Sequence, residues 1–143
     1  MEQSHDVEMT AALALGPGTR IAVIDNFVHR DGVLFLGADP TSIGHDGTVD
    51  AAQLRTATSA AGSRVLAVHT SPSCVAVRES RDVPLARSYE AVLDAAVLAE
   101  CDGLILNSGS SSIVLARTEV RTALARRRRL ATRAVKKDLG AAG

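Results

Sequence analysis

Short apolar runs alternate with breaks rich in Gly, Pro, Ser and Asp along the chain, and this pattern predicts strands alternating with helices. Extended segments are expected at residues 20–28, 33–37, 64–70, 82–88, 104–107 and 113–115. The first two flank the sequence His29-Arg30-Asp31-Gly32, in which Asp-Gly is a strong turn signal, so they are predicted to form a β-hairpin. Residues 1–18 are predicted to be a tail or a short helix that ends at Gly16-Pro17-Gly18.

Four helices are predicted from the periodicity of apolar positions and from residues that can cap a helix N-terminus. They are expected at residues 48–62, from 71 onward, at 88–100 and at about 119–139, with Thr48, Ser71, Ser88 and Thr118 as caps. Pro72 suits the first turn of the second helix, and Gly62 suits the end of the first.

This order of elements predicts one α/β domain with a mixed sheet, since strands and helices alternate after the hairpin. We expect the domain to span residues 19–125, with a basic helical extension over residues 126–143. A chain of 143 residues is long enough for one core. The core must be aliphatic, because the sequence has no Trp, one Tyr and two Phe.

The formal net charge is zero, but the charge is unevenly distributed. Residues 117–138 carry nine Arg or Lys against two acidic residues, a net charge of +7, which leaves −7 for the rest of the chain. The sequence therefore predicts an acidic body with a basic end.

The last predicted helix changes character along its length. Val120, Ala123 and Leu124 form an apolar stripe at i, i+3, i+4 that can dock on the body. Arg126, Arg127, Arg128 and Arg129 then surround the helix, because successive residues are about 100° apart. No face of that turn suits an apolar core, so the helix must leave the body or lie against acidic groups.

A second, weaker apolar stripe follows at Leu130, Ala131, Ala134 and Val135. Three interpretations of the basic helix remain open. It is a solvated tail, it pairs with the acidic body within the chain or between two copies, or it contacts nucleic acid or an anionic surface. The aromatic residues that usually stack on bases in nucleic-acid modules are missing here.

The segment Asn107-Ser108-Gly109-Ser110-Ser111-Ser112 between two apolar runs has three possible roles. A phosphate cradle of the Walker type needs a GK[ST] sequence, and a nucleophile elbow needs Gly-x-Ser-x-Gly; neither is present. A tight turn with side chains bonding their own backbone is favoured. If strand ends bring it to the Thr70-Ser71 loop, the candidate ligand-binding residues are Thr70, Ser71, Asn107, Gly109 and Ser110.

Other reactive residues point to no catalytic or metal centre. His69 and Cys74 could form a thiol–imidazole pair, but a half-buried His and a core Cys are the favoured interpretation. Asp25, in the first apolar run, is expected to point outward. No cofactor or metal is expected. A cytoplasmic location is expected because the N-terminus is acidic, no apolar run approaches about 20 residues, and the two Cys show no metal-like spacing.

Two motifs together resemble a known family. "RVLAVHTSPSCVAV" and "CDGLILNSGSSSIVLARTEVRTAL" look like the N-terminal domain of the SseB family (enhanced serine sensitivity protein) over roughly residues 20–125. In that family a strand ends in Phe-Thr-Ser before a helix, and a later strand leads into Asn-Pro-Gly-Ser. Thr70-Ser71 and Asn107, Gly109 and Ser110 match, whereas His69 replaces the Phe and Ser108 replaces the Pro. The resemblance implies a bacterial α/β domain without established catalytic residues.

The sequence therefore favours a non-enzymatic domain that binds a protein partner or acts as a scaffold or regulator. The candidate partner-binding residues are Arg126–Arg129, Leu130 and Val135. The alternative is a small-metabolite or hydrolytic site at the Thr70-Ser71 and Asn107–Ser110 loops. A third hypothesis is nucleic-acid or anionic-surface binding through Arg126–Arg129.

Overall fold

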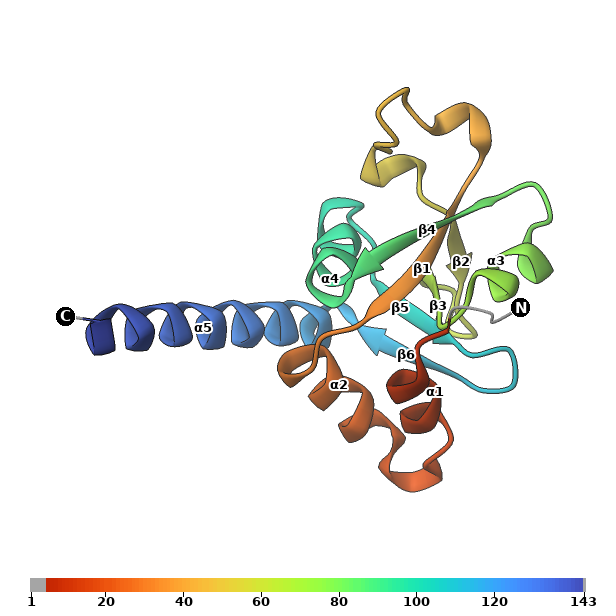
Figure 1. The fold of residues 1–143 in the computed structure, drawn as a ribbon. Coiled ribbons are helices and arrows are strands. Elements are labelled where there is room, and N and C mark those ends of the chain that lie inside the picture. Colours follow the sequence, from red (N-terminus) through yellow and green to blue (C-terminus); the bar gives the residue numbers. More distant parts are fainter. Residues whose placement is uncertain (1–4, 143) are drawn as a thin grey trace.

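The computed structural model describes residues 5–142, leaving aside the side chains of residues 77, 78 and 136–142. A six-stranded mixed sheet forms its centre, in the order β4-β1-β3-β5-β6, with β2 paired to β3 (Figure 1). The strands are β1 Val33–Ala38, β2 Thr56–Thr58, β3 Arg64–His69, β4 Val83–Ser88, β5 Gly103–Asn107 and β6 Ser112–Ala116. The predicted α/β class with a mixed sheet is confirmed.

Among the described strands, β3 and β5 pair in parallel and the other pairs are antiparallel. In the parallel pair, Leu66 lies beside Leu104 and His69 beside Asn107. The carboxyl ends of β3 and β5 therefore meet at one edge of the sheet. The Thr70-Ser71 segment and the loop after Asn107 both leave from that edge.

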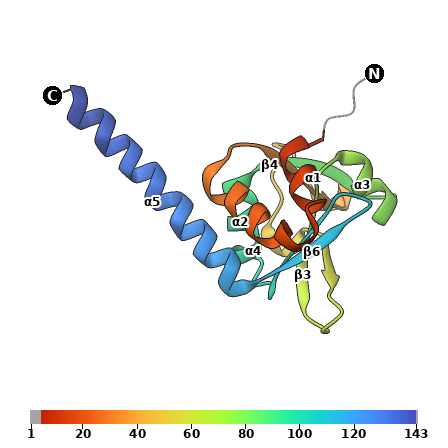
Figure 2. The same cartoon turned by 90° about the horizontal axis from the view of Figure 1, so that it is seen from below.

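Five α-helices and three short 3₁₀ turns are present in the described residues. The α-helices are α1 Val7–Leu13, α2 Thr19–His29, α3 Pro72–Arg78, α4 Tyr89–Leu98 and α5 Arg117–Ala142, and the 3₁₀ turns are η1 Gly16–Gly18, η2 Pro40–Ser42 and η3 Ala51–Gln53. Helices α1, α2 and α4 and the start of α5 contribute to one core with the sheet. Helix α3 packs near β1, β3 and β4 (Figures 1 and 2).

Side chains alternate between the two faces of the sheet along each strand, and the main hydrophobic core lies on one of these faces. On that face the fully buried leucines are Leu34, Leu36, Leu66, Leu104, Leu106 and Leu115. Burying each contributes about 2 kcal/mol of hydrophobic free energy. Two aromatic rings, Phe27 and Tyr89, meet edge to face with centroids 5.5 Å apart, and the core is otherwise aliphatic.

The opposite face of the sheet carries Phe35 together with a mixture of small, apolar and polar side chains, among them Gly37, Ala67, His69, Ile105 and Asn107. Helix α3 covers part of this face, and Val75 is 2% exposed there. We call this the open face of the sheet.

The predicted N-terminal hairpin is wrong. Residues 19–29 form helix α2, and residues 30–32 join it to β1. The apolar run suggested a strand, but Val23 and Phe27 are four residues apart and both fully buried, so they share one helical face. Asp25 does point outward, with 59% of its side chain exposed, and its carboxylate lies 3.7 Å from His29 Nε2 one helical turn further along.

The helix predicted at residues 48–62 is also wrong. This segment contains the short turn η3 and strand β2, which pairs with β3 through Thr56–Leu66 and Thr58–Arg64. Gly62, at φ +85°, serves the turn between β2 and β3 instead of ending a helix. Long-range strand pairing outweighs the moderate helix propensity of this Ala- and Thr-containing segment.

The remaining elements lie close to their predicted positions, but Thr118, predicted to cap α5, lies inside that helix, and Ser71 precedes α3 without a side-chain capping hydrogen bond. Pro72 begins α3, and Ser88 caps α4 by accepting a hydrogen bond from Ala91 N. Helix α5 begins at Arg117, close to the predicted start, and runs across the predicted domain boundary at residue 126. Within residues 5–142, no single helix is both long and apolar enough to cross a membrane; the segments Val7–Leu13 and Gly16–His29, bent by 115°, reach that threshold only as a pair.

Candidate functional site

The first half of α5 is packed on the body through the predicted stripe. Val120 and Ala123 are each 1% exposed, and Leu124 is 6% exposed. These residues contact the same core as α2 and α4. The docking stripe therefore fixes the direction in which the rest of the helix continues.

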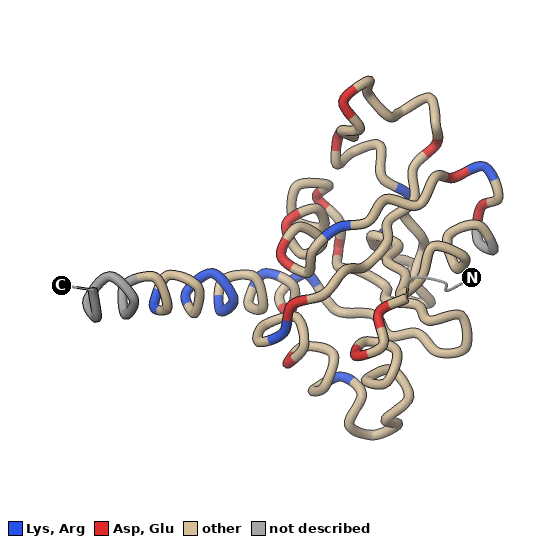
Figure 3. Tube along the Cα trace, in the orientation of Figure 1, with Lys and Arg blue, Asp and Glu red and all other residues tan. Residues whose placement is uncertain are grey.

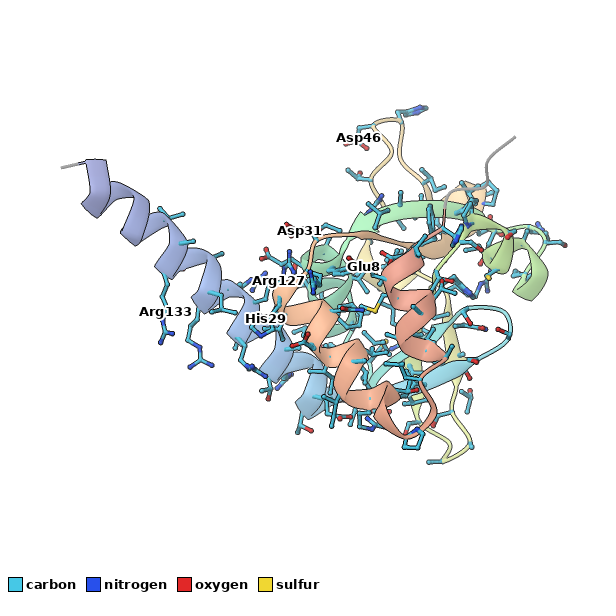
Figure 4. All side chains as sticks on the ribbon, turned by 60° about the horizontal axis from the view of Figure 1, so that its bottom comes forward. Glu8, His29, Asp31, Asp46, Arg127 and Arg133 are labelled. Carbon is cyan, nitrogen blue, oxygen red and sulfur yellow. The ribbon has the colours of Figure 1, made fainter. Side chains whose placement is uncertain are left out.

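Arg127 attaches α5 to the end of α2. Its guanidinium donates hydrogen bonds to the Phe27 and Arg30 carbonyl oxygens, at 3.0 and 2.6 Å, and pairs with Asp31 at 2.6 Å (Figure 4). Only 16% of this side chain is exposed. Because the last carbonyls of a helix lack intrahelical partners, Arg127 caps α2 while it anchors α5.

Arg128 makes a second attachment, to α4. Its guanidinium lies 3.2 Å from Asp94 Oδ1 and 3.8 Å from Glu90 Oε2. Arg127 and Arg128 thus pair with acidic groups of the body within one chain, one of the interpretations that the sequence left open.

Arg126 and Arg129 are placed differently from Arg127 and Arg128. Together with Arg133, Leu130 and His29 they line a hollow of about 220 Å³ beside the end of α2, which we call the basic groove. Among the described residues, no carboxylate pairs with Arg126, Arg129 or Arg133. The four consecutive arginines are therefore divided into two that hold the helix and two that face solvent.

Beyond Arg128 the helix projects from the body, as Figures 2 and 3 show. We call residues 129–142 the arm. The side chains from Arg129 to Val135 are exposed, and Leu130 and Val135 are 36% and 58% exposed. The candidate partner-binding residues Leu130 and Val135 therefore lie on the arm, uncovered by the domain.

The apolar stripe of the arm continues the docking stripe on the same side of α5. Ala131, Ala134 and Val135 follow Val120, Ala123 and Leu124 at a spacing of eleven residues. Eleven residues are close to three turns of about 3.6 residues, so the two stripes are nearly aligned. This apolar side of α5 is interrupted at Arg127; it is covered by the body before that residue and uncovered beyond it.

The two predicted ligand loops do come together at the ends of β3 and β5. Thr70 N donates to the Asn107 carbonyl oxygen at 3.0 Å, and the Thr70 carbonyl accepts from Asp6 N at 2.7 Å. Thr70 and Ser71 are nevertheless buried, 2% and 8% exposed. Thr70 connects α1, β3 and β5 through these bonds.

The serine loop is a self-bonded turn. Gly109, at φ +93°, donates its N–H to Asn107 Oδ1 at 2.8 Å, and Ser111 N–H donates to Ser108 Oγ at 3.2 Å. Ser110 is exposed at the tip. The loop borders a hollow of about 430 Å³ lined by Ser73, Cys74, Asn107, Gly109, Ser110, Ser111 and Ser112.

A second hollow lies on the open face of the sheet, and sequence reasoning missed most of its residues. This cleft has a volume of about 320 Å³ and includes Arg55, His69, Glu79, Asp82 and Asn107. Arg55 fell within the wrongly predicted helix, and Asp82 follows α3. No local motif joins the two, so only the folded topology brings them together.

Arg55 and Asp82 form a bidentate ion pair at the side of the cleft. Arg55 Nε lies 2.8 Å from Asp82 Oδ2, and its Nη2 lies 2.6 Å from Oδ1. The hydrogen bonds to Asp82 raise the pKa of the Arg55 guanidinium further. Asp82 is 1% exposed and Arg55 42% exposed, so a buried carboxylate orients a half-exposed arginine.

The two cysteines have different surroundings. Cys74 Sγ accepts a hydrogen bond from Ser71 Oγ at 3.2 Å, and Cys74 lines the serine-loop hollow. His69, considered above as its possible imidazole partner, lines the cleft instead. Burial raises the pKa of the Cys101 thiol, which is 3% exposed. Within the described residues, no cluster of three or more His, Cys, Asp and Glu could hold a metal ion.

These features define a single-domain α/β protein whose mixed sheet has one fully covered face and whose last helix continues past the body. The model of the SseB protein N-terminal domain matches residues 7–122, and the chain belongs to that family. The resemblance expected from the two motifs is thereby confirmed. No curated protein matches the chain, and no solved structure matches it.

Proposed function

We propose that this SseB-family domain is a non-enzymatic docking module that binds a protein partner along the arm of α5. The observation that carries the proposal is the apolar side of α5, which is covered at the docking stripe and resumes after the four arginines at the exposed residues Leu130 and Val135. A helix that projects into water without tertiary contacts is only marginally stable. Burying Leu130 and Val135 against a partner would stabilise it.

The positive charge of the arm favours an acidic partner. Arg129 and Arg133 have no acidic partner among the described residues, and the sequence adds Lys136 and Lys137 against Asp138. A second arm of the same kind would be repelled, since like charges within a Debye length of about 8 Å interact unfavourably. An acidic amphipathic helix would bury its apolar face on the stripe and place its carboxylates over the basic groove.

The proposal is tested with a fluorescent helical peptide of about 20 residues that has leucine at heptad positions a and d and glutamate elsewhere. Its fluorescence anisotropy is measured against the full chain. We expect binding of the glutamate peptide and none of a matched lysine peptide. Affinity should fall steeply as salt rises, because exposed charges are screened.

A pair of double variants locates the site. Leu130→Glu with Val135→Glu should weaken binding of the glutamate peptide by about tenfold or more, because it places like charge on the stripe. The matched control is Leu15→Glu with Ile21→Glu, which alters two residues that are 57% and 77% exposed and lie away from the arm. Equal binding by the two variants would remove the arm from the function.

The same assay addresses the nucleic-acid hypothesis. A 20-base-pair DNA duplex that binds more tightly than the peptide, with a strong salt dependence, would favour contact with phosphates through Arg126 and Arg129. The hydrolytic alternative has less support, since Thr70 and Ser71 are buried.

A further inference from the structure

We propose that the cleft on the open face of the sheet binds a small carboxylate-bearing molecule between Arg55 and Asn107. This site is separate from the arm and does not depend on the docking function. The cleft of about 320 Å³ lies at the lower end of the range of about 300–1,000 Å³ found for ligand pockets. Its size suits a compact metabolite.

The position of the cleft favours a ligand site. Asn107 and His69 lie side by side at the carboxyl ends of the parallel strands β5 and β3. Ligands of α/β sheets commonly bind outside the carboxyl ends of strands. Ala67 and Ile105, one step back on the same face, supply an apolar floor.

Arg55 is oriented toward a ligand before one arrives. Asp82 holds Nε and Nη2 of the guanidinium, and Asp82 itself is 1% exposed. No hydrogen bond within the described residues uses Nη1 of Arg55, so this donor remains for a carboxylate oxygen. Gly37 makes the arrangement possible, since a Cβ there would lie 2.8 Å from Asp82 Oδ2.

Asn107 supplies the second donor. Its Oδ1 accepts the Gly109 N–H at 2.8 Å, which fixes the orientation of the side-chain amide. The Nδ2 group donates no hydrogen bond among the described residues, and Asn107 lines both the cleft and the serine-loop hollow. A carboxylate at Arg55 and Asn107 would thus receive one charged and one neutral donor.

Glu79 places a negative charge in the cleft, which affects how tightly a carboxylate can bind. It lines the cleft, and its negative charge acts on Arg55, where it contributes to the raised pKa. A bound carboxylate would be repelled by Glu79, so neutralising that residue should strengthen binding.

The experiment is an NMR titration of the full ¹⁵N-labelled chain with sodium butyrate, at ionic strength held constant with NaCl. Butyramide is the matched neutral probe. A ligand of this size is expected to bind in about the millimolar range. We expect saturable shifts of the Gly109 N–H and Asn107 Nδ2–H₂ signals with butyrate and much smaller ones with butyramide.

Two variants complete the test. Asn107→Asp keeps an oxygen that can accept the Gly109 N–H but replaces the donor by a negative charge, and it should weaken butyrate binding at least about tenfold. Glu79→Gln should tighten binding by a few-fold, while ¹⁵N spectra confirm that both variants are folded. Equal response to butyrate and butyramide, unchanged binding by Asn107→Asp, or no saturable shift at all would overturn the proposal.

Discussion

Among individual residues, the buried polar groups Tyr89 and Asp6 form a hydrogen-bonded pair. Tyr89 is fully buried, and its hydroxyl donates a 2.6 Å hydrogen bond to Asp6 Oδ2, while Asp6 Oδ1 caps α1 by accepting from Met9 N. Burial, and then the hydrogen bond to Asp6, raise the pKa of Tyr89 above its ordinary value. The pair connects the N-terminal helix to the start of α4.

The raised pKa of Tyr89 predicts a loss of stability in alkali. In the unfolded chain the phenol ionises near pH 10, but in the folded chain it stays protonated to higher pH. The stabilisation is therefore complete below about pH 10 and is lost as pH rises from there through the folded pKa. The free energy of unfolding should fall by up to about 1.4 kcal/mol per pH unit relative to Tyr89→Phe. Urea unfolding at pH 8 to 11 measures this difference; parallel curves for the two proteins would contradict it.

Gly103 is a second residue that the packing requires. A Cβ at this position would overlap the Leu115 carbonyl oxygen of the neighbouring strand β6. Gly103→Ala should therefore lower the free energy of unfolding by at least about 2 kcal/mol, because backbone must move to relieve the contact. Gly18→Ala is the control, since a Cβ at Gly18 meets nothing within 4 Å and should change stability by less than about 1 kcal/mol. Similar denaturation midpoints for the two variants would show that the β5–β6 pairing is not this close.

At the scale of elements, Arg127 and Arg128 attach α5 to the body, and Arg127 is the less exposed of the two. Arg127→Ala removes donors from the Phe27 and Arg30 carbonyls and from Asp31, and should cost about 2 kcal/mol of folding free energy. Arg126→Ala, one residue earlier, removes a side chain without described ion pairs and should change stability by less than about 0.5 kcal/mol. Chemical denaturation measures the free energy of unfolding of both variants. A larger loss of stability in Arg126→Ala than in Arg127→Ala would contradict the anchoring role of Arg127.

The elements also show where sequence reasoning succeeded and where it failed. Strands β3 and β5 and helix α4 were predictable, because their apolar periodicity and caps are local signals. Helix α2 was not, since its apolar run of Ile, Val and Phe is typical of a strand. Its helical form depends on Val23 and Phe27 packing into a core built by distant segments. Strand β2 likewise exists through its pairing with β3.

At the scale of the whole molecule, two features set where ligands can approach. One face of the sheet is fully covered by helices, and the other is covered by α3 only in part, which leaves the cleft. The uneven charge along the sequence corresponds to a body with scattered acidic residues and a basic arm (Figure 3). The sequence could predict the arm and its exposed stripe, because both follow from helical periodicity.

The cleft could not be predicted in the same way. Arg55, Glu79 and Asp82 are spread over 28 residues and two loops, and they meet through strand order and register. Thr70 and Ser71 were proposed as ligand-binding residues in case the two loops converge at the strand ends; the loops do converge, but both residues are buried. Asn107 was singled out for the serine loop and also lines the cleft.

Hydrogen–deuterium exchange of the full chain, with and without the glutamate peptide, tests most directly whether the arm is a docking surface. In the free chain, the amides of residues 120–128 should be protected and those of residues 130–135 should exchange fast, because no described hydrogen bond or ion pair joins residues 130–135 to the body. With the peptide, protection should extend to residues 130–135 while the body stays unchanged. Exchange that is unaffected by the peptide, or protection confined to the body, would contradict the account.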